Sequence, residues 1–258
     1  MVCCAVPERS QESEVRRQNR GSRTGALILS SDFRLLTPDF FNSQERELTI
    51  MMPRLIPEQG EVMDILKRTG AYREGHFVYP LGQHTPHYFQ MPLAFRYYDT
   101  ARVLAVALSR KLRLEKDVSS ALPKISIISP SPGGIPVAFA VREALSADQI
   151  YWAEREDGQR MFRQYVNAGE VNPAVIVDDI SRTGEALKET AALVREMGTR
   201  VIGCGVIVRF NSAPDRIEIP DGDPIPVLSL ANFEAKWYDT ADACAECKKG
   251  LTEEHVRF

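Results

Sequence analysis

The stretch VIVDDISRTGEAL, residues 175–187, decides the fold. An apolar run over residues 174–177 is followed directly by two acids, Asp178 and Asp179, and then by a short loop that opens a helix-forming segment. The run predicts a buried strand with the acids at its carboxyl edge. Unpaired N–H groups at the start of the next helix favour an anion, and carboxylates accept hydrogen bonds from vicinal hydroxyls. The stretch predicts a site for a ribose 5-phosphate; the alternative is an ordinary strand-to-helix turn with two solvated acids.

Strands and helices alternate around this stretch. We expect strands over residues 125–129, 149–154, 174–179 and 200–210, and helices over residues 58–70, 99–115, 134–145 and 183–198. Asp99 or Thr100 is the expected N-cap of the second helix. Helices between strands imply right-handed crossovers and a mostly parallel sheet, with ligands beyond the carboxyl ends of its strands. The fold class is therefore α/β, with a mostly parallel central sheet flanked by helices.

Composition excludes several classes of protein. The chain has 258 residues, of which 44% are apolar and 26% are charged, as in ordinary globular proteins. Its net charge of −3 offers no footprint for nucleic acid. We see no apolar run near the roughly 18 residues that a membrane helix needs. The five cysteines form no disulfide framework, which favours a reducing cytoplasm.

Residues 1–50 differ from the rest of the chain. They hold seven Arg, no Lys and no sustained helical or strand period. We expect a disordered or weakly ordered extension there. The alternative is that Met51 or Met52 is the true start of the protein.

The stretch at 175–187 resembles the signature of the type I phosphoribosyltransferases. The resemblance implies that Asp178 and Asp179 contact the ribose hydroxyls of phosphoribosyl pyrophosphate (PRPP). It also implies that the following loop, made of Ser181, Arg182, Thr183 and Gly184, holds the 5-phosphate. Arg182, Glu185 and Ala186 depart from the commonest pattern, and Arg182 could add a forked phosphate contact.

A second loop supports the first. The segment ISIISPSPGGIPVAFAVREAL, residues 125–145, reads as a strand, a Ser, Pro and Gly loop and a helix. It resembles the family's pyrophosphate loop, in which small residues let backbone amides approach the diphosphate. The resemblance assigns PRPP binding to Ser131, Gly133 and Gly134.

The segment GAYREGHFVYPLGQHTPHYFQMPLAF, residues 70–95, resembles the amino-terminal hood of orotate phosphoribosyltransferases. The resemblance implies that the hood covers the base and part of PRPP. The base-binding candidates are His76, Phe77, His84, Tyr88 and Phe89. For the two phenylalanines, the alternative role is packing in the core.

Residues 151–170 resemble the family's flexible loop, a mobile basic hairpin that closes over the diphosphate. Its cations here are Arg155, Arg160 and Arg163, and no Lys or His occurs between Ile125 and Leu187. Arginine neutralises charge but stays protonated, so it cannot serve as a general acid. A solvated charged hairpin is the alternative.

Two further motifs are assigned no site. Cys244, Cys247 and His255 suggest zinc, but a structural zinc site needs four ligands and only three lie here. We therefore predict no metal bound directly by the protein. Gly203 and Gly205 lie inside a strand without a third glycine, which excludes a dinucleotide motif.

Together these features predict an orotate-type phosphoribosyltransferase. The resemblance implies transfer of the phosphoribosyl group of PRPP to orotate, with Mg²⁺ bound through PRPP, in a cytoplasmic homodimer. The rival functions are transfer to another nucleobase and non-catalytic PRPP sensing. The predicted parts are an extension at 1–50, a phosphoribosyltransferase domain at 51–240 with its hood near 70–98 and its core at 99–212, and a C-terminal tail at 241–258.

Overall fold

The computed structural model describes residues 55–162, 167, 169–219 and 222–256. The helices are α2 (Gln59–Arg68), α3 (Pro92–Phe95), α4 (Tyr98–Leu114), α5 (Lys116–Ala121), α6 (Ile135–Leu145), α7 (Glu185–Glu196) and α8 (Ala245–Lys248). The strands are β1 (Tyr72–Val78), β2 (His84–Phe89), β3 (Ser126–Ser129), β4 (Gln149–Glu156), β5 (Gln159–Phe162), β6 (Ala174–Ser181), β7 (Val201–Phe210), β8 (Arg216–Ile219), β9 (Gly222–Phe233) and β10 (Glu254–His255). The extension predicted for residues 1–50 lies outside the described residues.

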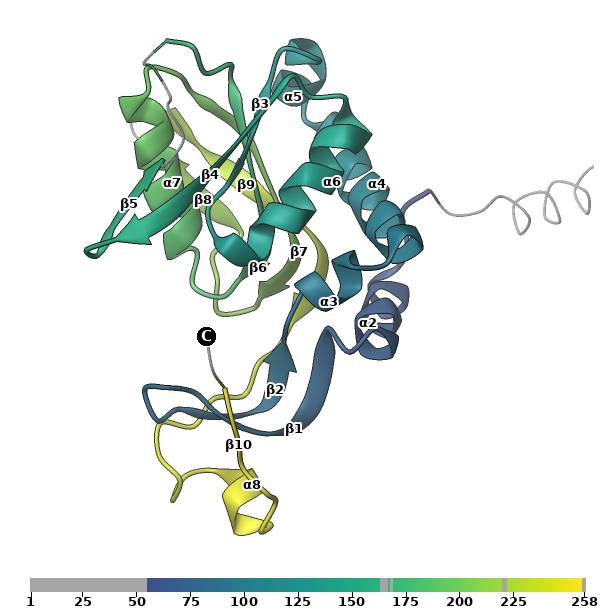
Figure 1. The fold of residues 1–258 in the computed structure, drawn as a ribbon, viewed down its shortest axis with the longest axis vertical. Helices are drawn as coiled ribbons and strands as arrows, with labels where there is room; N and C mark the ends of the chain where they lie inside the picture. Colours follow the sequence, from purple (N-terminus) through teal and green to yellow (C-terminus); the bar gives the residue numbers. More distant parts are fainter. Residues whose placement is uncertain (1–54, 163–166, 168, 220–221, 257–258) are drawn as a thin grey trace, which may run out of the picture. The chain divides into compact units, whose positions relative to one another are not determined.

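The larger sheet has the strand order β5-β4-β3-β6-β7-β9-β8 (Figure 1). Its five inner strands pair in parallel, whereas β5 and β8 pair antiparallel at the edges. The chain passes from β3 outward to β4 in one direction and from β6 outward to β7 in the other. The sheet therefore has a topological switch point between β3 and β6, which is where ligands bind in open α/β sheets.

Helices cover both faces of this sheet, because the inner strands alternate their apolar side chains between two cores. Ile127, Val175 and Val177 face the core that contains α4 and α6. Ile128 and Ile176 face the core that contains α7. Figure 1 shows α4 and α6 on one side of the sheet and α7 on the other. The sheet is thus buried between two layers of helices, which confirms the predicted α/β class.

Every predicted helix and strand is present, with ends within two residues of the prediction. The predicted N-cap of the helix at 99–115 is wrong. The helix α4 begins at Tyr98, and Tyr97 is its N-cap. The hydroxyl of Thr100 donates to the carbonyl oxygens of Ala94 and Tyr97, so it accepts no helix N–H.

The sheet continues beyond residue 212, through strands that the sequence pattern did not indicate. The long strand β9 pairs in parallel with β7, and β8 pairs antiparallel with β9. Pro224 and Pro226 lie within β9 and weaken its strand signal, because proline cannot donate to a strand ladder.

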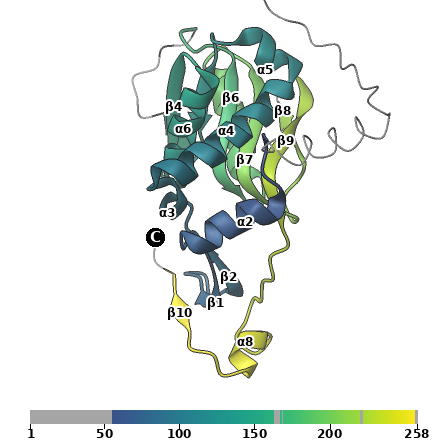
Figure 2. The ribbon, with the colours of Figure 1, turned by 90° about the vertical axis from the view of Figure 1, so that its right-hand side faces the viewer.

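A second, smaller sheet has the order β10-β1-β2. The strands β1 and β2 form an antiparallel hairpin, and β10, near the end of the chain, pairs in parallel with β1. Figure 2 shows this sheet beside α2, with α8 close to the chain's C-terminal segment. We call the β1–β2 hairpin the hood.

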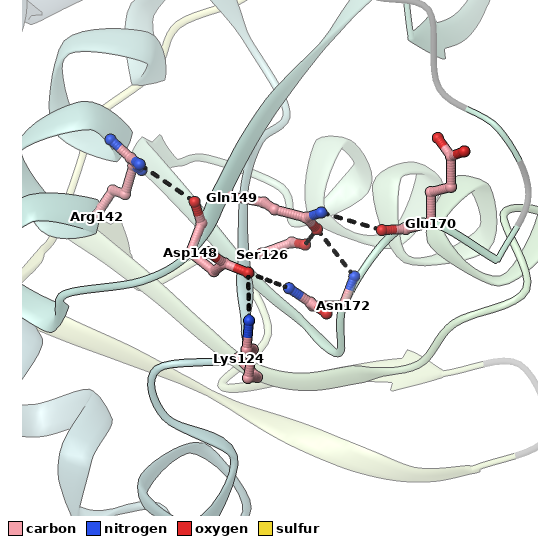
Figure 3. Close-up of polar contacts among 7 residues, drawn as sticks. All are labelled: Lys124, Ser126, Arg142, Asp148, Gln149, Glu170 and Asn172. Carbon is pink, nitrogen blue, oxygen red and sulfur yellow. Dashed lines mark hydrogen bonds and ion pairs between the residues drawn. The ribbon is translucent and has the colours of Figure 1, made fainter.

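A polar network fixes the amino ends of the inner strands, opposite the acid pair (Figure 3). The carbonyl oxygen of the Gln149 side chain accepts hydrogen bonds from Ser126 Oγ at 2.7 Å and from the Asn172 backbone N–H at 3.1 Å. The Gln149 amide donates to the Glu170 carbonyl at 3.1 Å. Asp148 Oδ2 accepts from Asn172 Nδ2 at 3.2 Å. These contacts hold β3, β4 and β6 in register.

Gly203 in β7 allows α5 to pack closely on the sheet. A Cβ atom at this position would lie 2.8 Å from Val118 Cγ2. Val118 is fully buried, so it has little room to move. Close packing therefore explains why glycine occupies position 203, and no dinucleotide-binding role is needed to explain it.

We expect Gly203→Ala to lower the free energy of unfolding by about 1–3 kcal/mol, because overpacking a filled core forces side chains or backbone to shift. The measurement is urea unfolding followed by circular dichroism. The matched control is Gly60→Ala in α2, where a Cβ atom meets nothing within 4 Å. Equal stability of the two variants would contradict the packing argument.

Candidate active site

The acid pair lies at the carboxyl end of β6, beside the switch point. Asp178 is only 2% exposed, and Asp179 is half-buried. Asp178 Oδ1 accepts hydrogen bonds from Ser131 Oγ at 2.7 Å and from the Asp179 backbone N–H at 3.0 Å. Burial raises the pKa of Asp178, and the adjacent Asp179 raises it further, although the Ser131 hydrogen bond opposes this. Burial also raises the pKa of Asp179.

The loop after β3 packs directly against these acids. A Cβ atom on Gly133 would lie 2.6 Å from Asp179 Oδ2, and one on Gly134 would lie 2.3 Å from Asp178 Oδ1. Any larger residue would displace a carboxylate. Ser131 caps this loop by accepting the Gly134 N–H at 3.2 Å while it donates to Asp178. The sequence-predicted loop residues and the acid pair therefore form one structural unit.

The turn after β6 leads into α7 as the sequence predicted. Gly184 is the N-cap of α7 and has a φ of 83°, in the left-handed region that favours glycine. Thr183 is exposed, whereas Ser181 is buried. Among the residues that the structure describes, the Ser181 hydroxyl is a buried group without a hydrogen-bond partner. An unpaired buried hydroxyl is uncommon in native proteins and points to a missing partner.

The side chain of Arg182 contacts the hood. Its guanidinium lies over the rings of Tyr79 and Trp237, at 5.2 Å and 4.6 Å from their centroids. The rings themselves meet edge to face, at 5.1 Å between centroids. Arg182 therefore joins the turn after β6 to the end of β1 and to the segment after β9. A forked contact of Arg182 with phosphate stays a prediction.

Two of the predicted loop cations, Arg155 and Arg160, lie on the β4–β5 hairpin and pair with Glu189 of α7. Arg160 Nε lies 3.0 Å from Glu189 Oε2, and Arg155 contacts the same oxygen. Burial tends to raise the pKa of Glu189, but the hydrogen bonds from both arginines outweigh it and lower the pKa. Arg163 lies outside the described residues.

The aromatic residues of the hood pack mainly against one another. Phe77 is buried and stacks on Tyr88, with 5.2 Å between ring centroids. Phe89 is half-buried and contacts Tyr72 and Phe233, at 4.7 Å and 4.9 Å between centroids. The packing alternative considered for the two phenylalanines thus describes their surroundings in this structure.

The two hood histidines face the C-terminal cysteines. His76 Nε2 lies 2.9 Å from His84 Nδ1 and 3.4 Å from Cys247 Sγ. The other ring nitrogen of His76 lies 3.0 Å from the Leu251 carbonyl oxygen. Both ring nitrogens of His76 therefore have partners, and these include the C-terminal residues Leu251 and Cys247.

Sequence reasoning missed Glu189, Tyr79 and Trp237. Glu189 reads as one acid on the polar face of a helix, and its partners lie 29 and 34 residues away. Tyr79 and Trp237 belong to different segments, which meet only in the folded chain. The amphipathic pattern of α7 carries no signal that distinguishes Glu189.

The fold and this site define a type I phosphoribosyltransferase. Among solved structures, UMP synthase from Leishmania donovani matches with a TM-score of 0.50 and 17% identity, over 77% of this chain and 41% of that one. At this identity the likeness shows the fold alone. No protein-family model matches the chain.

Curated sequences identify the family. The orotate phosphoribosyltransferase of Thermotoga petrophila is 31% identical over 195 residues, which cover 75% of this chain and 95% of the relative. Orotate phosphoribosyltransferase 2 of Mesorhizobium japonicum is 31% identical over 180 residues, or 69% of this chain and 86% of the relative. The chain therefore belongs to the orotate phosphoribosyltransferase family.

We expect the pairing of Glu189 with Arg155 and Arg160 to stabilise the folded chain in a pH-dependent way. The ordinary pKa of a glutamate is 4.5, and the folded-state pKa of Glu189 is lower. The contribution is therefore complete above pH 4.5 and is lost as the pH falls through the lowered pKa. Because Glu189 is 35% exposed, Glu189→Gln should cost no more than about 1 kcal/mol near neutral pH.

Unfolding free energies measured from low pH to neutrality check this expectation. Glu196→Gln, at an exposed position of the same helix, is the matched control. A loss in Glu189→Gln that is as large in acid as at neutrality would contradict the ion-pair interpretation.

Proposed function

We propose that the protein transfers the 5-phosphoribosyl group of PRPP to orotate, giving orotidine 5-monophosphate and diphosphate. One observation carries the proposal: Asp178 and Asp179 end the strand at the switch point and contact a glycine loop, while a second turn opens α7 beside them. In this arrangement the two carboxylates can accept hydrogen bonds from hydroxyl groups. They lie between the backbone N–H groups of the loop after β3 and those of the turn before α7. A sugar that carries phosphate groups at both ends has the complementary chemistry.

The acids and the two loops have distinct proposed roles. Asp178 and Asp179 accept hydrogen bonds from the ribose hydroxyls and orient the ring. The turn from Ser181 to Gly184 holds the 5-phosphate, and the dipole of α7 favours its negative charge. A phosphate oxygen near this turn would also offer the Ser181 hydroxyl a partner. Gly133 and Gly134, with the Ser131 hydroxyl, admit the diphosphate.

Positioning and charge neutralisation carry the rate in this proposal. Displacement at the anomeric carbon passes through an oxocarbenium-like state, and the leaving diphosphate gains negative charge. Arg155, Arg160 and Arg163 are the proposed cations for that group. The ion pair of Arg155 with Glu189 is exposed, and such pairs contribute only about 0–1 kcal/mol, so exchanging Glu189 for diphosphate oxygens costs Arg155 little. Forked hydrogen bonds to phosphate are stronger than this.

Mg²⁺ belongs to the proposal as the partner of PRPP. The donors around Asp178 are carboxylate and hydroxyl oxygens, which are the ligands that Mg²⁺ prefers. Burial raises the pKa of both acids, and the adjacent Asp179 raises that of Asp178 further; a cation would offset the charge of the ionised pair. Bound with PRPP, Mg²⁺ supplies positive charge to the diphosphate.

The hood is the proposed cover for the base. Tyr88 and Phe89 are the candidates with partly exposed side chains. We assign Phe77 to packing, because it is 2% exposed. His76 and His84, also predicted to bind the base, are buried together against the cysteines.

A homodimer is the proposed assembly. Tyr98 and Phe139, on α4 and α6, expose 75% and 46% of their surface. A groove of about 240 Å³ lies between these helices, lined by Tyr98, Ala101 and Ala140 among others. A second copy of the chain would cover these apolar side chains. We further propose a cytoplasmic location, because the cysteines that the structure describes form no disulfide, as is usual in a reducing compartment.

The structure adds one finding on membranes. In the described part of the chain, no helix has both the length and the apolar character needed to cross a bilayer.

The decisive experiment incubates the purified full chain with PRPP, Mg²⁺ and orotate and follows the loss of orotate absorbance. We expect turnover. The double variant Asp178→Asn, Asp179→Asn should lose PRPP binding in calorimetry and lower kcat/KM by at least about 100-fold, because charged acceptors for the ribose are gone. Asp223→Asn, at an exposed position at the start of β9, is the control and should behave like the native chain.

Other results would favour the rival functions. Turnover with a purine or another base, but not with orotate, would identify a different acceptor. PRPP binding without turnover of any base would indicate a PRPP sensor. Undiminished PRPP affinity in a folded double variant would remove the site assignment altogether.

A separate prediction concerns the loop glycine. Gly134→Ala places a methyl group against Asp178 Oδ1 and Ser129 Oγ, so the acid must move. Misplacing a catalytic group by about 1 Å can lower the rate about 100-fold. We expect kcat/KM for PRPP to fall by that factor, whereas Gly60→Ala leaves it unchanged. Steady-state kinetics at varied PRPP concentration make the measurement, and native kinetics in Gly134→Ala would show that the loop tolerates a side chain.

A further inference from the structure

Four potential metal ligands converge where the hood meets the end of the chain. They are His76 of β1, His84 of β2, and the cysteines Cys244 and Cys247 at the start of and within α8. One ligand atom from each residue lies within 4.8 Å of all the others. His76, His84 and Cys244 are buried, and Cys247 is half-buried. Residues so far apart in sequence meet here only because the chain end folds back on the hood.

Three sulfur–nitrogen distances in this cluster are those of a tetrahedral site. Zinc bonds of about 2.0–2.1 Å to nitrogen and 2.3 Å to sulfur place neighbouring ligand atoms about 3.3–3.8 Å apart. Cys244 Sγ lies 3.6 Å and Cys247 Sγ lies 3.4 Å from His76 Nε2. Cys247 Sγ lies 3.5 Å from His84 Nδ1, and the two ring nitrogens are 2.9 Å apart. Small shifts would bring all four atoms onto one ion.

The surroundings of His76 set its tautomer. His76 Nδ1 lies 3.0 Å from the Leu251 carbonyl oxygen, which can only accept, so Nδ1 carries the proton and donates it. In the neutral ring this leaves a lone pair on Nε2, which faces the cluster. A metal-binding histidine typically has this outer hydrogen bond to a carbonyl.

Negative groups surround the cysteines. A carboxylate oxygen of the buried Glu246 lies 3.5 Å from Cys244 Sγ, and one of Glu253 lies 3.8 Å from Cys247 Sγ. Lys249 Nζ, at 3.8 Å from Glu246, is a nearby positive group on an exposed side chain. As thiols, the two cysteines donate to these carboxylates. As thiolates, the form that binds metal, they would place four negative groups together, and a central divalent ion would offset that charge.

We propose that His76, His84, Cys244 and Cys247 bind one structural zinc ion. Two thiolates with two imidazoles in a tetrahedral arrangement are a donor set that suits zinc. With four protein ligands the site is closed to substrate, so its role is to attach the C-terminal segment to the hood. The C-terminal part of the chain also borders the hood on both edges: Tyr238 pairs with His84 on the outer edge of β2, and β10 pairs with the outer edge of β1.

The proposed site differs from the sequence interpretation, which counted three candidate ligands near the C-terminus: the structure brings together four candidates. His255 is not one of the four: it is exposed, and its Nε2 lies 3.6 Å from Glu253. The missing ligands come from the hood, where His76 and His84 had been assigned to the base.

The first test is the metal content of the full chain, purified without chelator and measured by mass spectrometry. We expect about one zinc per chain, and X-ray absorption should show sulfur at about 2.3 Å and nitrogen at about 2.0–2.1 Å. The double variant Cys244→Ser, Cys247→Ser should retain at least tenfold less zinc, since even outer partners of a zinc site change affinity by about 10–100-fold.

His255→Asn is the matched control, because it removes a nearby histidine that the structure leaves outside the cluster. It should keep its zinc. The native-chain measurements do not depend on how well any variant folds. A metal-free native chain, a zinc ion with only oxygen and nitrogen neighbours, or a disulfide between Cys244 and Cys247 in freshly purified protein would each overturn the proposal.

Thermal stability tests this inference separately from the proposed function. Removal of zinc by a chelator should lower the thermal midpoint of unfolding of the native chain. It should lower the midpoint of His255→Asn by the same amount. The cysteine variant should unfold at the lower midpoint whether or not chelator is present. Unchanged stability of the native chain after complete zinc removal would contradict a structural role, whatever the enzyme does with orotate.

Discussion

The contact between the loop after β3 and the acids that end β6 is the constraint on which the candidate site depends. Both acids lie so close to the loop that only glycine fits at positions 133 and 134. The contact spans the switch point, and α6 and α7 leave the sheet on opposite faces from there. The polar network at the other end of the strands keeps β3, β4 and β6 in register (Figure 3). This register places the loop after β3 beside the acids that end β6.

The same contact gives the site its electrostatic character. Adjacent carboxylates in a poorly solvated corner hold their protons more tightly than free carboxylates do. Hydroxyl groups that donate to these oxygens favour the ionised form, so binding of a sugar and loss of protons reinforce each other. A buried acid pair of this kind costs stability, as is common where function and stability conflict.

Much of this could be predicted from sequence because the informative residues are contiguous. The apolar run before Asp178 and the glycines at 133 and 134 each mark a strand, a turn and a helix within a few residues. Long-range features gave no such signal. Glu189 meets Arg155 only across the fold, and Cys244 meets His76 across 168 positions. Tertiary contacts also outweighed local patterns in β9, where prolines lie inside a strand.

The contact of Arg182 with Trp237 couples the turn before α7 to a fluorescent side chain. Its guanidinium stacks on Trp237, and its backbone belongs to the turn that opens α7. The indole therefore senses any movement of that turn through a change in its immediate charge environment. The chain has two tryptophans, and Trp152 lies on β4. The fluorescence of Trp237 can therefore report the position of this turn, and Trp152 is the one other tryptophan that contributes to the signal.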